Sequence, residues 1–154
     1  MRTRRPCPAH RVPTLIAAIL LAGSIRPPAA SATDKDYYFP EVRVEVAVER
    51  DGSFLVDEFR TFEFRGRFSF AYIVIPLRID RPGVEREVSI SEIEVTDEQG
   101  QGLRTEISEK GGELTARWFY SARDERRTFR IHYRVSGGIS SYSDATELYW
   151  QVIG

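Results

Sequence analysis

Two stretches of strict period-two alternation constrain the fold of this chain more than any other feature. Between residues 41 and 49 a valine occupies every second position, and charged residues occupy most of the positions between. Between residues 128 and 135 apolar and polar side chains alternate in the same way. Because successive side chains of a strand point to opposite faces, each stretch predicts a β-strand with one buried and one solvated face. The buried sets are Val42, Val44, Val46 and Val48 in the first strand and Phe129, Ile131, Tyr133 and Val135 in the second.

Turn-forming sequences separate these strands from further short apolar runs. Asp51-Gly52 supplies the positive φ angles that a tight hairpin needs, and Asp97–Gly100 and Arg123–Arg127 mark later turns. About seven strands at spacings of about 8–12 residues, with no helical period, predict an all-β protein. We therefore expect residues 33–154 to form an immunoglobulin-like antiparallel β-sandwich.

Three of the expected strands carry irregularities. Phe59 is out of phase with Phe62 and Phe64, which predicts either a bulge or a strand covered on both faces. Residues 68–75 form an almost continuous apolar run that a proline ends, as in a central strand or a covered edge. A change of face at Ser91-Glu92 predicts an interruption of another strand.

The first 32 residues have the three-part pattern of a secretory signal peptide. Four arginines precede an apolar segment at residues 14–25, and Ala30-Ser31-Ala32 supplies small residues for cleavage. The apolar segment has about 12 residues, whereas a helix that crosses a bilayer needs about 20. We expect residues 1–32 to be a signal peptide helix cleaved after Ala32, with an uncleaved anchor or a buried helix as the alternative. The domain that follows is then exported across the inner membrane, to the periplasm or cell envelope on the extracytoplasmic face.

Composition excludes several classes of partner and chemistry. The first 32 residues hold five arginines and no acid, so residues 33–154 carry 17 basic and 23 acidic residues. An acidic domain lacks the basic stripe that nucleic acid requires, and no nucleic-acid partner is expected. The single cysteine, Cys7, lies within the expected signal peptide, which leaves no thiol for a disulfide, a metal or a nucleophile.

Catalytic and metal-binding patterns are equally sparse. His132 is the only histidine after residue 32, and it lies on the polar face of an expected strand. There we expect a solvated surface residue and not the base of a hydrolase triad. Structural zinc needs four Cys or His ligands, and the sequence lacks them. Asp51-Gly52-Ser53 and Asp97-Glu98 suit turns better than a calcium loop. The sequence therefore predicts no enzyme, no catalytic residue, no metal site and no cofactor.

Aromatic clusters are the remaining candidates for binding. Exposed rings bind sugars and proteins because they bring large contact area at low entropic cost. Rings in a small sandwich nevertheless lie more often in the core. The candidate partner-binding residues are Trp118, Tyr120, Tyr149 and Trp150.

Several segments resemble a known bacterial family. They are Asp51–Glu58, Ile75-Pro76-Leu77, Phe129–Gly137 and, most specifically, Asp144–Gly154 with its Glu-Leu-Tyr-Trp sequence. In these segments the chain is similar to the predicted membrane proteins called domain of unknown function 2207, over nearly all residues after 32. It departs from them at Tyr72–Pro76, where members tend to carry an arginine and an acid before Ile-Pro.

The resemblance implies an extracytoplasmic β-domain followed by further strands, transmembrane helices and a tail, with no established activity. None of those membrane segments occurs here, so we expect a domain that is incomplete at its C-terminus and exposes apolar surface at one edge. Membrane association would then come through segments missing from this chain. We expect a noncatalytic interaction or sensory domain whose partner is an envelope protein or polysaccharide. The alternative is a carbohydrate-binding module or a fragment of an envelope glycosidase.

Overall fold

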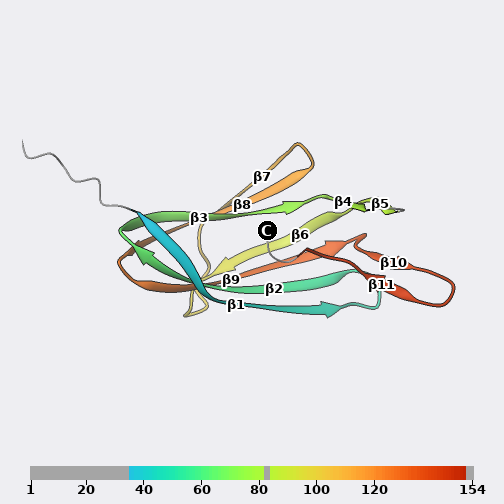
Figure 1. Ribbon diagram of the computed structural model, residues 1–154, viewed down its shortest axis with the longest axis horizontal. Helices are drawn as coiled ribbons and strands as arrows, with labels where there is room; N and C mark the ends of the chain where they lie inside the picture. The colour runs from blue at the N-terminus through green and yellow to red at the C-terminus, as the bar shows by residue number, and fades with distance from the viewer. Residues whose placement is uncertain (1–34, 82–83, 152–154) are drawn as a thin grey trace, which may run out of the picture. The chain divides into compact units, whose positions relative to one another are not determined.

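A computed structural model describes residues 35–81 and 84–151 (Figure 1). The chain divides into two units, residues 1–31 and residues 32–154. The expected signal peptide, with its helix and its cleavage after Ala32, lies outside the described residues. The features below all belong to the second unit.

The described residues of this unit form strands and turns and no helix, which confirms the predicted all-β antiparallel architecture. The strands are β1 (Asp36–Val48), β2 (Phe54–Arg65), β3 (Arg67–Pro76), β4 (Arg78–Arg81), β5 (Val84–Glu87), β6 (Ser89–Thr96), β7 (Thr105–Lys110), β8 (Glu113–Arg123), β9 (Arg126–Ser136), β10 (Ile139–Ser141) and β11 (Thr146–Leu148).

Two sheets make the sandwich. The larger has the strand order β1-β2-β9-β6 and the smaller has the order β3-β8-β7, while β4-β5 and β10-β11 form separate hairpins. Figure 1 shows β3, β7 and β8 together on one side of the unit and β1, β2 and β9 on the other. Every pairing is antiparallel.

Two adjacent corners carry the chain from one sheet to the other. The first joins β2 to β3 at Gly66 and the second joins β8 to β9 at Asp124, which both have positive φ. The Asp124 carboxylate accepts a hydrogen bond from the Gly66 amide (2.7 Å), and the Asp124 amide donates to the Gly66 carbonyl (3.1 Å). These corners place β3 opposite β2 and β8 opposite β9.

The core lies between the sheets, and the second alternating stretch supplies much of it. Phe129, Ile131, Tyr133 and Val135 of β9 are each at most 1% exposed, as the alternation predicts. From the smaller sheet, Trp118 packs edge-on against Phe129 with 5.7 Å between ring centroids. Burying a side chain of this size contributes about 1.5–3 kcal/mol, so these residues account for much of the stability of the sandwich.

Of the three predicted irregularities, the one in β6 is confirmed and the one at Phe59 is not. The apolar run 68–75 lies in β3, which is neither a central strand nor a covered edge, because β3 is an edge of the smaller sheet and exposes Phe70, Tyr72 and Val74. In β6 the pairing with β9 slips between Ser91 and Glu94, with Glu92 at φ 55°, as predicted. Strand β2 pairs with β9 without a slip, so Phe59 simply points to the outer face, where the Arg43 guanidinium lies 3.9 Å from its ring centroid. The bulge at this edge is instead in β1, between Tyr38 and Glu41.

The first alternating stretch is only partly buried, contrary to the prediction of one buried face. Val42 and Val44 are half-buried, whereas Val46 and Val48 are 42% and 61% exposed. The reason is the unequal width of the two sheets. Because β3 and β8 lie opposite β2 and β9, β1 extends past the edge of the three-stranded sheet.

Candidate functional site

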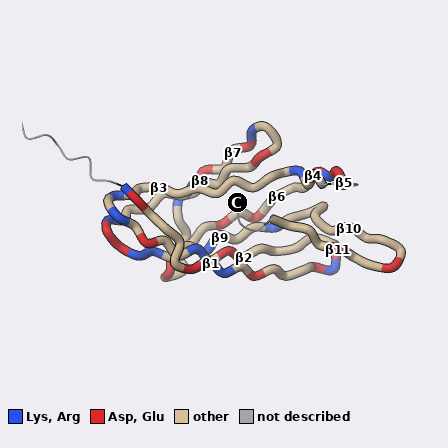
Figure 2. The backbone as a smooth tube through the Cα atoms, viewed as in Figure 1, with Lys and Arg blue, Asp and Glu red and all other residues tan. Residues whose placement is uncertain are grey.

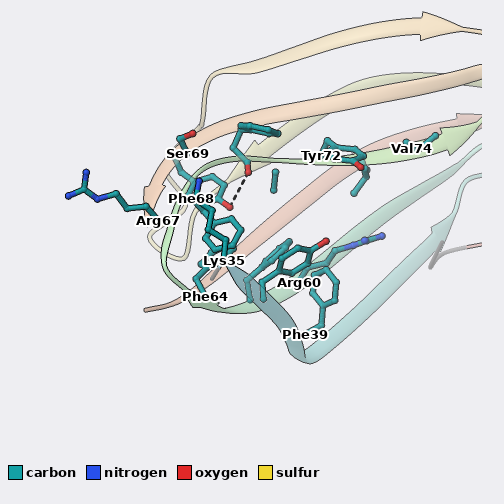
Figure 3. A pocket seen from close by; sticks show the side chains of 15 residues that line it. Lys35, Phe39, Arg60, Phe64, Arg67, Phe68, Ser69, Tyr72 and Val74 are labelled. Carbon is teal, nitrogen blue, oxygen red and sulfur yellow. Dashed lines mark hydrogen bonds between the residues drawn. The ribbon is translucent and has the colours of Figure 1, made fainter. Parts of the chain in front are cut away.

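An apolar cleft of about 530 Å³ opens where β1 extends past β3 (Figure 3). Eight aromatic rings from β1, β2, β3 and β8 line it: Tyr37, Phe39, Phe62, Phe64, Phe68, Phe70, Tyr72 and Tyr120. In Figure 3, Tyr72 and Val74 follow β3 along one side, and Phe39 of β1 lies on the other. The cleft therefore separates the edge strands of the two sheets.

The floor of the cleft is buried and closely packed, and its rim is accessible. Phe62 and Phe64 form the floor, are 5% and 2% exposed, and stack on each other with centroids 5.2 Å apart. Phe39 packs against Phe62 at 4.5 Å. Such ring pairs contribute about 0.5–1.5 kcal/mol beyond their buried area, which holds the floor in place. On the rim, Tyr37 and Tyr72 are 50% and 58% exposed and remain open to a ligand.

Tyr120 joins the cleft to the backbone of β3. Its hydroxyl donates a hydrogen bond to the Phe70 carbonyl at 3.3 Å, next to the point where the β3–β8 pairing slips. Burial raises the pKa of Tyr120, so its hydroxyl stays protonated and keeps donating at physiological pH. Tyr120 thus fixes one end of β3 relative to the cleft.

The charges around the cleft are all positive among the described lining residues, which include Lys35, Arg60 and Arg67 but no Asp or Glu. Arg60 is already paired, because its Nε donates to Glu58 at 2.8 Å. Lys35 and Arg67 lie where β1 and β3 begin, and in Figure 3 Arg67 extends outward from that end. The cleft is thus apolar along its length and cationic at one end.

A buried polar network lies behind the cleft. Glu58 is 2% exposed, and its carboxylate accepts hydrogen bonds from Arg60 and from the Tyr133 hydroxyl (2.7 Å). Trp150 Nε1 in turn donates to the Tyr133 oxygen at 3.3 Å. This network was not predicted from the sequence. The even-numbered positions of β2 point inward and include residue 58, so the alternation could have identified Glu58 as buried. A buried carboxylate with two donors is a structural element that positions β2, β9 and the Trp150 ring.

His132 lies on the outer face of the four-stranded sheet, as expected, but its side chain is only 18% exposed and so is less solvated than predicted. Its Nδ1 lies 2.9 Å from Asp57, which also accepts from Arg130 Nε at 2.6 Å. Burial alone would raise the pKa of Asp57, but the hydrogen bonds from Arg130 and His132 outweigh it and lower the pKa below its usual value. Asp57 of β2 thus links that strand through its carboxylate to Arg130 and His132 of β9.

The two turns weighed as calcium sites use their carboxylates for backbone geometry. Asp51 Oδ1 accepts from the Ser53 amide and hydroxyl at 2.9 and 2.7 Å. Asp97 Oδ1 accepts from the amides of Gln99 and Gln101 at 3.0 and 2.9 Å. Both are Asx-type turns.

Of the four predicted partner-binding aromatics, the structure brings only Tyr120 into the cleft. Trp118 is fully buried, which corrects the expectation that its ring contacts a partner. Trp150 is half-buried and packs on Phe54 with centroids 5.6 Å apart, and Tyr149 is 49% exposed. The rings of β1, β2 and β3 that line the cleft were not among the predicted site residues.

The chain matches the model of a protein family over most of its length. The family model described as "Predicted membrane protein (DUF2207) N-terminal domain" matches residues 38–154, and no curated protein or solved structure matches the chain. No helix within residues 35–81 and 84–151 has the length and hydropathy to span a bilayer. Since the family model covers most of the sequence, the chain belongs to the DUF2207 family of predicted membrane proteins and contains its N-terminal domain.

Proposed function

We propose that residues 33–154 form a noncatalytic interaction or sensory domain of a membrane-associated envelope protein, and that its partner binds in the cleft between β1 and β3. The aromatic rim of this cleft carries the proposal. Tyr37, Phe39, Phe70 and Tyr72 are each 42–58% exposed around one apolar hollow. Contiguous apolar surface of this kind marks interaction sites, and aromatic residues dominate binding energy at such sites.

We further propose that the domain faces the extracytoplasmic side. The signal-peptide pattern of residues 1–32 supports this side, and the membership of a family of predicted membrane proteins supports association with the envelope. The absence of cysteine after residue 7 is compatible with an oxidising compartment, where free thiols are a liability.

Site-specific photocrosslinking tests the proposal in cells that produce the full chain. A photoreactive amino acid replaces Tyr72 on the cleft rim or, as the matched control, Ile107 on β7. Both residues lie on edge strands of the same sheet and are 58% and 47% exposed. We expect a discrete protein adduct from position 72 and none from position 107.

Equal crosslinking from both positions, or none from position 72, contradicts the assignment of the cleft. An adduct with polysaccharide instead of protein supports the carbohydrate-binding alternative. Substrate turnover by the purified chain that a single substitution abolishes contradicts the noncatalytic assignment.

A further inference from the structure

One edge of the sandwich lacks the features that keep edge strands from pairing with other chains. Exposed edges are normally blunted by charged residues, prolines or bulges. Strand β1 has charged residues and Pro40 at its bulge, β6 has a bulge at Glu92, and β7 carries Glu106, Glu109 and Lys110. Residues 68–76 of β3 contain no charged residue, and Figure 2 shows β3 in tan between charged ends. The pairing of β3 with β8 slips between Phe68 and Phe70, and the strand ends at Pro76. Between these points, residues 70–75 form the longest stretch at an edge of the two sandwich sheets, within the described residues, that has no charge, proline or bulge.

The backbone edge of β3, and not merely one of its faces, borders the cleft. Eight consecutive residues, 67–74, line the hollow. Neighbouring residues of a strand point to opposite faces, so a ligand that met only one face would touch every second residue. Consecutive residues can all border one space only where that space lies beside the strand. The unpaired backbone groups of β3 therefore face the cleft.

The position beside β3 is also the one that the sandwich leaves open. The larger sheet has four strands and the smaller has three. Beyond its first residues, where Tyr37 contacts Phe68 of β3 at 5.9 Å, β1 has no counterpart across the core within the described residues. A strand placed about 4.8 Å from β3 would lie opposite β1 at the usual sheet separation of about 10 Å. It would cover the exposed rings of Tyr37, Phe39 and Tyr72.

We infer, building on the proposed function, that an extended segment of a partner protein, called the guest strand below, pairs antiparallel with the free edge of β3. Apolar side chains at alternate positions of the guest strand enter the cleft, and an acidic residue lies at its C-terminal end. Strand addition of this kind takes affinity from backbone hydrogen bonds and specificity from pockets for alternate side chains.

The positive charges at the beginning of β3 and the antiparallel direction of pairing together predict which residue type the C-terminal end of the guest strand carries. Lys35 and Arg67 both lie where β1 and β3 begin, and within the described chain neither takes part in an ion pair. An antiparallel guest ends where β3 begins, so its C-terminal residues meet these two cations. An acidic side chain or a terminal carboxylate complements them, while a basic one is repelled.

Peptide selection tests this inference on the full chain. Phage-displayed random peptides of about twelve residues are selected on the purified protein, because at about 3.3 Å per residue they span the length of β3. We expect the enriched sequences to carry apolar residues at alternate positions and Asp or Glu near the C-terminal end. Tyr72→Lys, which places a charge beside the edge, should weaken binding of the synthetic peptides at least about tenfold, whereas Ile107→Lys should leave it unchanged.

N-methylation of the peptides separates strand pairing from other modes of binding. Methylating every second backbone amide on the side that faces β3 should weaken binding about tenfold or more, and methylating the other amides should have little effect. If neither set matters but Tyr72→Lys still weakens binding, strand addition is wrong while the cleft remains a binding site. If no peptide is enriched, or if the chain instead dimerises through β3 in a way that Tyr72→Lys abolishes, a partner strand is likewise excluded.

Discussion

The hydroxyl of Tyr133 is the link that joins β9 to the buried carboxylate of β2, and Tyr133→Phe removes this hydroxyl while it keeps the ring. Tyr133 is 1% exposed and donates to Glu58 Oε1 at 2.7 Å. A hydrogen bond to a charged group contributes about 1.5–3 kcal/mol, and Trp150 Nε1 loses its acceptor in addition. We therefore expect Tyr133→Phe to lower the free energy of unfolding by about 3 kcal/mol.

Urea unfolding of the full chain, followed by tryptophan fluorescence, measures this loss. With a typical slope of about 2 kcal/mol per molar urea, the midpoint should fall by about 1.5 M. Tyr142→Phe is the matched control, because Tyr142 is 52% exposed and its removal should change stability by less than about 0.5 kcal/mol. If the two variants unfold at the same urea concentration, Glu58 does not depend on Tyr133 and the proposed network is refuted.

Three further outcomes follow from the same contacts. A Cβ added at Gly138 would lie 2.6 Å from the Phe54 ring, so Gly138→Ala should destabilise the chain by about 1–3 kcal/mol in thermal unfolding, and Gly102→Ala, which meets open space, should not. Because folding lowers the pKa of Asp57, its carboxylate stabilises the fold at pH values above its ordinary pKa of 3.8, and this stability is lost as the pH falls through the pKa of the folded chain. The free energy of unfolding of Asp57→Asn should therefore fall less steeply with acid than that of the parent chain. Parallel curves would contradict this. Burial, with Glu58 nearby, raises the pKa of Tyr133. The protonated hydroxyl therefore contributes its full stability below about pH 10, and this contribution declines as the pH rises above 10. Tyr133→Phe should reduce that alkaline decline.

Local sequence signals predicted the parts of the fold that depend on neighbouring residues. The alternation at residues 128–135 identified the inward side of β9, and the change of face at Ser91-Glu92 identified the bulge of β6. Parity within a strand is a local property, so the sequence alone reveals it. The pairing of β1 is not local, and the exposure of Val46 and Val48 depends on the three-stranded width of the opposite sheet.

The cleft was not predicted, because it forms where two separate segments meet. The aromatic residues 37–39 and the apolar run 68–75 were both visible in the sequence, but their contact, such as Tyr37 with Phe68 at 5.9 Å, requires the β2–β3 corner. The run has apolar side chains on both faces of the strand, with Ile73 and Ile75 buried and Tyr72 exposed. Trp118 shows the converse, since it shares the inward parity of Leu114 and Ala116 and is therefore a core residue.

Hydrogen exchange at the amides of β3 tests the central claim, that this edge receives a partner strand, most directly. The full chain is compared with and without a selected peptide at saturation. We predict that every second amide of β3 (Arg67–Pro76) exchanges more slowly in the complex, while the amides of the opposite edge, β7 (Thr105–Lys110), are unchanged. Unchanged exchange along β3 in a saturated complex would show that the partner binds elsewhere and would contradict the claim.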